Sequence, residues 1–135
     1  GLGEAARLIL ALIPAHIRYL IIDLPECLYF SRRFLTLHRL ENRVRFIEAS
    51  DLEGLNIAYR SGLAFNQGSF QEMHPQTIAN YFAWLHAQGV SNIWSMNGSK
   101  TVFPIDGWRS SYDRHVPAFI NVDCVVDKEI VFERV

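Results

Sequence analysis

Residues 1–23 of the chain are GLGEAARLILALIPAHIRYLIID, a glycine-rich turn followed by an apolar helix and an apolar strand that ends in an acid. The glycines of the turn, Gly1 and Gly3, have no Cβ, so the backbone there can bend tightly and approach a ligand closely. Asp23 closes the strand, where a carboxylate can accept hydrogen bonds from both hydroxyls of a ribose. This order of elements predicts the first half of a nucleotide-binding α/β unit.

One element of such a unit is missing from the sequence. A glycine turn of this kind normally follows a buried parallel strand, and no residue precedes Gly1. We therefore expect a partial domain that lacks the first strand of its own sheet. The gap is expected between the strand that begins at Ile17 and the strand that begins at Gly62.

Helical periodicity and short apolar runs predict alternating helices and strands along the chain. The expected helices span 4–13, 25–40 and 75–88, and the expected strands span 17–22, 43–47, 62–66 and 92–96. Residues 100–117 look irregular, and 119–126 with 129–135 are expected to form an antiparallel hairpin around Asp127-Lys128. Because helix-separated strands require right-handed crossovers, the sequence predicts one α/β domain over 1–135, with a Rossmann-like, doubly wound, mostly parallel sheet and a C-terminal hairpin.

Composition and charge exclude several classes of function. Thirteen basic and fourteen acidic residues give a net charge of −1 without a basic stripe, so we expect no nucleic-acid partner. No signal-peptide pattern and no apolar run of about 20 residues is present, so we expect no membrane span. The two cysteines, Cys27 and Cys124, are too few for a disulfide scaffold, which favours a cytoplasmic location. The histidines show no metal-ligand spacing, and we expect no metal.

The glycine turn fits two classes of cofactor. As G-x-G-x-x-A, residues 1–6 match a dinucleotide fingerprint, with Asp23 at the distance expected for a ribose contact. As the end of an acidic-x-G-x-G motif, the same residues suit S-adenosylmethionine, which has a ribose and no pyrophosphate. A third interpretation is a helix-capping turn together with an aspartate that caps the helix at Pro25. The expected C-terminal hairpin and the polar loop at 65–73 favour the methyl donor.

Several strings along the chain occur together: Asp23-Leu24-Pro25-Glu26, Phe65-Asn66, Ser69-Phe70-Gln71-Glu72-Met73, Tyr81-Phe82 and Asn97. This set resembles the sugar O-methyltransferases, bacterial proteins of the class I S-adenosylmethionine-dependent methyltransferase fold that are often associated with polysaccharide biosynthesis. The resemblance extends from Gly1 to about Asn97 and is weaker afterwards. It implies an enzyme that methylates a hydroxyl of a sugar acceptor, either a small molecule or a polysaccharide.

The resemblance also implies roles for the residues that bind the donor. Gly1 and Gly3 let the backbone pass close to the donor's amino-acid end, and Asp23 takes the ribose hydroxyls. Ser50 or Asp51, which follow the third expected strand of such a sheet, lie near the adenine. Asp51 fits equally well as an N-cap for the turn that follows it.

The loop after the next strand holds the candidates for catalysis. By the same resemblance, Asn66 and Gln67 lie beneath the methionine part of the donor or face the acceptor, while the competing account is an asparagine that holds its own loop together. Glu72 is the preferred acid or base, because methyl transfer requires an aligned hydroxyl oxygen and removal of its proton. The alternative for Glu72 is to cap the next helix. His74 and His115 are loop histidines that can act as bases or be solvated.

Two other functions stay open at this point. An NAD(P)-dependent oxidoreductase fits the glycine turn, although the hairpin is unexpected there and no Tyr-x-x-x-Lys pair is present. A degenerate, non-catalytic Rossmann-like interaction domain fits the same fold. Binding of S-adenosylmethionine or of NAD by the protein separates the three alternatives.

Overall fold

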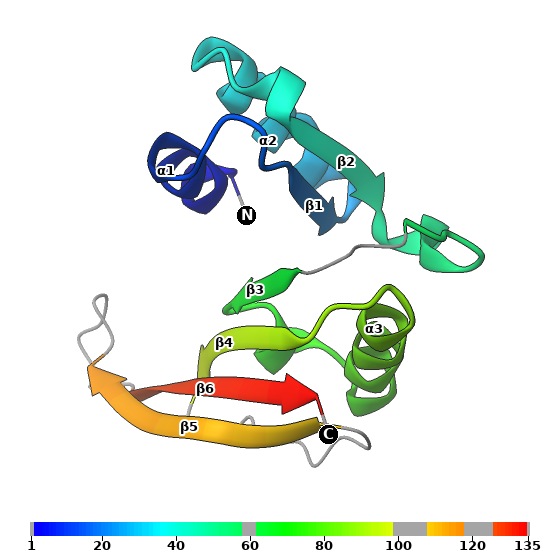
Figure 1. Cartoon of the computed structure of the whole chain (residues 1–135), viewed down its shortest axis with the longest axis vertical. Helices are drawn as coiled ribbons and strands as arrows, with labels where there is room; N and C mark the ends of the chain where they lie inside the picture. Colours follow the sequence, from blue (N-terminus) through cyan, green and yellow to red (C-terminus); the bar gives the residue numbers. More distant parts are fainter. Residues whose placement is uncertain (1, 58–61, 99–107, 118–125, 135) are drawn as a thin grey trace. The chain divides into compact units, whose positions relative to one another are not determined.

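The computed structural model describes residues 2–57, 62–98, 108–117 and 126–134. The chain divides into two compact units, Gly1–Leu55 and Asn56–Val135, and each is described here by itself. Both units combine helices with strands (Figure 1), as predicted for a mixed α/β fold.

Unit 1 is a parallel strand pair with its connecting helix and a preceding helix. Its elements are α1 (Glu4–Leu12), β1 (Tyr19–Asp23), α2 (Pro25–Leu37), β2 (Val44–Glu48) and two single-turn 3-10 helices, η1 (Glu41–Arg43) and η2 (Ala49–Leu52). β1 and β2 pair in parallel, from Tyr19 opposite Val44 to Asp23 opposite Glu48. The helices and strands predicted for this part of the chain are therefore confirmed to within a few residues.

Helix α1 packs through one face only. Ala6 is 2% exposed and Leu10 is 1% exposed, whereas Leu8 is 50% exposed and Leu12 is 87% exposed. Burial is therefore confined to one face, although the helix is apolar along most of its length. The helix is amphipathic in its packing because residues four positions apart, such as Ala6 and Leu10, share a single face.

Arg43 holds the end of α1 to the start of β2. Its guanidinium donates hydrogen bonds to the carbonyl oxygens of Leu10 at 2.7 Å and Pro14 at 2.9 Å. Longer bonds reach Ile13 at 3.3 Å and Ile17 at 3.5 Å. These bonds satisfy carbonyls that a helix end leaves without internal partners, so one side chain fixes the connection between α1 and β1.

Unit 2 is a four-stranded sheet with one helix. Its elements are β3 (Leu63–Gln67), the 3-10 turn η3 (Phe70–Glu72), α3 (Pro75–Ala87), β4 (Asn92–Gly98), β5 (Trp108–Pro117) and β6 (Val126–Arg134). The strand order is β3-β4-β6-β5. β3 and β4 are parallel, while β6 runs antiparallel to both β4 and β5. The core packs α3 and η3 against the sheet (Figure 1) through Phe70, Ile78, Phe82, Val90 and Ile93.

The C-terminal strands differ from the sequence prediction. Residues 108–117, expected to be irregular, form β5. Asp127 and Lys128, expected at a hairpin turn, lie inside β6, and the expected strand 119–126 falls almost wholly outside the described residues. β6 pairs with a strand on each side, and this long-range pairing outweighs the local turn preference of the Asp-Lys pair. An antiparallel pair is nevertheless present, between β5 and β6.

Candidate functional site

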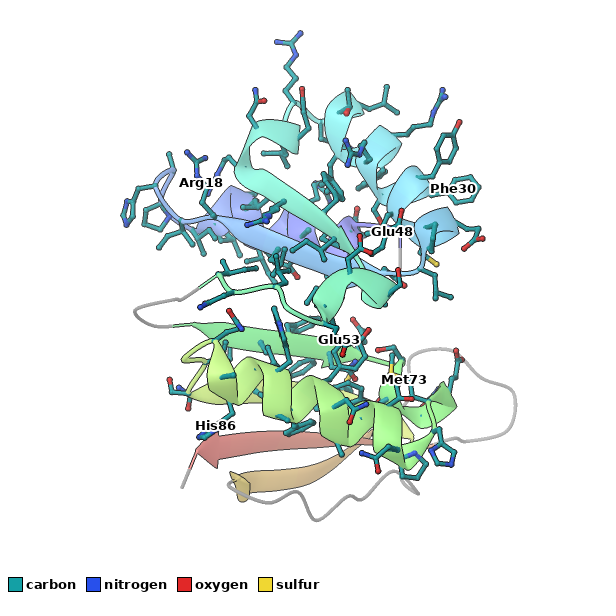
Figure 2. The ribbon with its side chains drawn as sticks, turned by 90° about the vertical axis from the view of Figure 1, so that its right-hand side faces the viewer. Arg18, Phe30, Glu48, Glu53, Met73 and His86 are labelled. Carbon is teal, nitrogen blue, oxygen red and sulfur yellow. The ribbon has the colours of Figure 1, made fainter. Side chains whose placement is uncertain are left out.

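The carboxyl ends of β1 and β2 carry two acids. Asp23 ends β1, and its register partner Glu48 ends β2, as Figure 2 shows for Glu48. Asp23 is partly exposed and its Oδ1 accepts a hydrogen bond from the backbone N–H of Leu24 at 2.9 Å. Glu48 is not among the residues predicted from the sequence, although an acid at the end of the next parallel strand is a signal that could identify it.

Asp23 does not occupy the N-cap position of α2. That position is held by Leu24, whose side chain makes no capping hydrogen bond. The interpretation of Asp23 as the aspartate that caps the helix at Pro25 is therefore wrong. A carboxylate has about four acceptor positions, so the bond from Leu24 is compatible with additional hydrogen bonds from ribose hydroxyls.

Gly3 has a structural reason to be glycine. It is the N-cap residue of α1 and has φ 88°, a left-handed conformation that side chains disfavour. A Cβ at this position would make ordinary van der Waals contact with the side chain of Leu35 at 3.4 Å and with the Cα of Ser31 at 3.5 Å, so φ is the reason for glycine. Gly3 therefore serves as the N-cap of α1, as the capping interpretation expected, while its contact with a cofactor stays a prediction. Gly1 lies outside the described residues.

Ser50 and Asp51 lie inside η2, directly after β2, and both are exposed. The N-cap residue of η2 is Glu48, and the alternative of Asp51 as an N-cap for the turn at Leu52 to Gly54 stays a prediction. The hydroxyl of Ser50 donates a long hydrogen bond to Oδ1 of Asp51 at 3.4 Å. Both side chains thus follow the carboxyl end of a parallel strand, where a ligand of such a sheet binds.

A hollow of ≈ 480 Å³ in unit 1 includes Asp51 and Glu48. It lies between α2 and β2, and its aromatic wall is Tyr29 and Phe46. The guanidinium of Arg32 stacks over the ring of Phe46, 4.7 Å from its centroid. The lining also includes four charged side chains, Arg32, Arg45, Glu48 and Asp51, so the hollow is more polar than a typical small-molecule site. Of the predicted cofactor residues of this unit, the hollow includes Asp51 but neither Asp23 nor Gly3.

A polar network joins the ends of β3 and β4 in unit 2. Oδ1 of Asn66 accepts a hydrogen bond from Nδ2 of Asn97 at 2.8 Å, and Nδ2 of Asn66 contacts the hydroxyl of Ser69. Asn97 also donates to Oγ of Ser95 at 2.6 Å, and its Oδ1 accepts from the backbone N–H of Gln71 at 3.3 Å. Asn66 thus holds its own loop, as the competing account expected. Its contact with a donor stays a prediction.

Glu72 and His74 have different surroundings. His74 is the N-cap residue of α3, and its Nδ1 accepts a hydrogen bond from the backbone N–H of Gln76 at 3.2 Å. The cap expected of Glu72 is therefore supplied by His74, and that alternative for Glu72 is wrong. Glu72 is exposed at the end of η3. His115, expected in a loop, lies in β5.

The cap limits what His74 can do as a base. An imidazole nitrogen that accepts a hydrogen bond carries no proton, so the neutral ring of His74 bears its proton on Nε2. To take a further proton, His74 must use Nδ1 and lose the cap.

In the parts of the chain that the structure describes, no three histidine, cysteine or acidic side chains are placed to hold a metal ion. The expectation that the protein uses no metal stays a prediction. Among the helices within those same ranges, none has the length and apolar composition needed to cross a membrane.

No protein-family model matches the chain, and no curated protein sequence matches it. Solved structures do match. The mitomycin 7-O-methyltransferase MmcR has a TM-score of 0.70 at 12% identity, with 100% of this chain and 47% of that chain covered. PigF with SAH has a TM-score of 0.65 at 16% identity, with 99% and 48% covered. A pericyclic reaction enzyme has a TM-score of 0.66 at 12% identity, with 100% and 41% covered.

These likenesses concern the fold. The chain spans less than half the length of each of these three proteins. The similar structures include S-adenosylmethionine-dependent methyltransferases, one of them from Leishmania major. A pericyclic reaction enzyme is also similar in fold, so the fold alone does not determine which reaction a chain catalyses.

Proposed function

We propose that the chain is the S-adenosylmethionine-binding part of a methyltransferase that acts on a hydroxyl group of a sugar. The observation that carries the proposal is the placement of Asp23 at the carboxyl end of a parallel strand, where it is partly exposed. A carboxylate in that place is suited to a ribose. The fold likeness to methyltransferases, PigF with SAH among them, supports the choice of cofactor.

The proposal includes one doubly wound sheet. β1 and β3 are edge strands of their own sheets. The next strand along the chain pairs with each of them, β2 with β1 and β4 with β3. In open α/β sheets, ligands bind outside the carboxyl ends of the strands, and Asp23 lies at that end of β1.

Each predicted residue then has a defined task. Asp23 accepts hydrogen bonds from the ribose hydroxyls, and Gly3 keeps the backbone beside the donor free of a side chain. Ser50 or Asp51, in the turn after β2, contacts the adenine. Asn66, at the end of β3, lies beneath the methionine part of the donor or faces the acceptor.

The bound donor supplies a methyl group attached to a positively charged sulfur. Glu72 would accept the proton of the acceptor hydroxyl as its oxygen takes the methyl group, and would then pass that proton to water. The donor would be left as neutral S-adenosylhomocysteine. The exposed position of Glu72 and the use of His74 as a helix cap support this assignment. The sugar acceptor is supported by the strings that resemble sugar O-methyltransferases.

Titration calorimetry tests the cofactor. The protein should bind S-adenosylhomocysteine and S-adenosylmethionine, and should not bind NAD. Binding of NAD alone would favour the oxidoreductase, and binding of none of the three would favour a non-catalytic domain.

A radiolabelled methyl donor tests the reaction. Labelled methyl should enter nucleotide-linked or polymer-terminal sugars that carry free hydroxyls. Donor binding without transfer to any acceptor in such a screen would leave the donor site intact and refute the sugar acceptor.

A further inference from the structure

We propose that Asn97 is a positioning residue that orients both Asn66 and the η3 loop that carries Glu72. The inference rests on the proposed function, because it assigns a role within the same site. Asn97 lies in β4 and is 4% exposed, so it acts through its neighbours.

Both the nitrogen and the oxygen of the Asn97 side-chain amide form hydrogen bonds. Its Nδ2 donates to Oδ1 of Asn66 at 2.8 Å and to Oγ of Ser95 at 2.6 Å, which engages both N–H groups. Its Oδ1 accepts from the backbone N–H of Gln71 at 3.3 Å. An amide is the side chain that can donate twice and also accept, and no aliphatic residue of similar size can replace these contacts.

The contacts connect two parts of the proposed site. Asn66 lies at the end of β3 and is separated from Asn97 by thirty-one residues. Gln71 lies in η3, directly before Glu72. One buried side chain therefore fixes the amide proposed to face the donor and the backbone beside the proposed base.

Burial makes this arrangement rigid. A buried polar group without a partner costs considerable free energy, so the amide of Asn97 holds the one orientation that satisfies its neighbours. Phe70, 7% exposed in the core, anchors the same loop by packing. The packing of Phe70 is non-directional and keeps the loop against the core. The hydrogen bonds of Asn97 are directional and set the orientation of the loop.

The test compares two ligands on Asn97→Ala in the full chain. S-adenosylhomocysteine has the amino-acid end that Asn66 is proposed to face, and methylthioadenosine lacks it. The Kd for S-adenosylhomocysteine should rise roughly 3- to 10-fold, the loss typical of one hydrogen bond, while the Kd for methylthioadenosine stays within error. Amide exchange at Gln71 should also become faster, as measured by NMR.

Asn92→Ala is the matched control. Asn92 is an exposed asparagine of the same strand, and its side chain donates to Ser91 at 3.0 Å. It should change neither affinity nor the exchange rate. If Asn97→Ala does not fold, Asn97→Ser keeps a polar group in the buried position but is too short to reach all the partners, and it should give the same selective loss.

Each outcome decides between the proposals. Equal changes in both affinities, or no change in either, would overturn the positioning role while the donor site stands. If the unaltered protein binds neither ligand, the proposed function fails and the role of Asn97 fails with it.

Discussion

Asp23 and Glu48 are register partners at the last positions of β1 and β2. Residues in register on neighbouring parallel strands point to the same face of the sheet, so two carboxylates mark one corner of this edge. One carboxylate has enough acceptor positions for both hydroxyls of a ribose, and the proposal assigns that contact to Asp23. The two acids can be compared directly, because they lie on different strands at the same position in the register.

Asp23→Ala should weaken binding of S-adenosylhomocysteine by about 1.5–3 kcal/mol, the value for hydrogen bonds to a charged group. Calorimetry measures the change. Glu48→Ala is the control at the same level of the sheet and should change the affinity much less. An equal loss in both variants would mean that the ribose does not depend on Asp23 in particular, and an unchanged affinity in Asp23→Ala would remove it from the site.

Arg39→Gly should stabilise the protein. Arg39 has φ 57° directly after α2, where its N–H bonds to the carbonyl of Thr36 at 2.9 Å and the N–H of Leu40 bonds to that of Leu35 at 3.0 Å. This is the Schellman arrangement, in which glycine is preferred because a left-handed conformation costs other residues about 1–2 kcal/mol. After the entropy that glycine loses on folding, a gain of roughly 0.5–1 kcal/mol should appear in chemical denaturation.

The control for Arg39→Gly is Arg39→Ala, which removes the same side chain but keeps a Cβ. It should leave the free energy of unfolding nearly unchanged. If both variants gain equally, the effect comes from the loss of the arginine side chain and the backbone argument is wrong.

Ionisation of the Tyr19 hydroxyl makes the free energy of unfolding depend on pH in the alkaline range. Burial raises the pKa of the Tyr19 hydroxyl above its ordinary value. The folded state therefore holds this proton more tightly than the unfolded state, so the contribution is fully present below a pH of about 10 and is lost as pH rises through the raised pKa. Absorbance titration should show that the late-ionising signal of Tyr19 disappears in Tyr19→Phe. Persistence of the late ionisation in that variant would contradict the assignment.

Local signals predicted the helices and the parallel strands well. Pro25 and Pro75 each begin the helix that the sequence placed there, because proline at the first helical position has a fixed, local cause. The alternation of helix and strand likewise follows from periodicities within short windows. These parts of the fold depend on neighbours in the sequence, which a single chain displays.

The remaining features depend on contacts between distant residues. β6 contains Asp127 and Lys128 because β4 and β5 pair with it, one on each side. No local sequence pattern predicts that pairing. The bond from Asn97 to Asn66 likewise crosses between strands. The sequence identified both asparagines in the strings of the family resemblance, yet their contact, and hence the buried network, is a property of the folded sheet.

Glu72→Gln should lower turnover roughly 10²–10⁴-fold, because glutamine keeps the shape of the side chain and removes its basicity. Donor affinity should stay nearly intact, since the proposed role begins with the acceptor's proton. His74→Asn is the matched control: asparagine is a good N-cap, so this variant should keep both the stability of α3 and most of the turnover. If instead His74→Asn abolishes turnover at normal stability while Glu72→Gln is active, the base is His74, and its hydrogen bond to Gln76 must break in the reacting state.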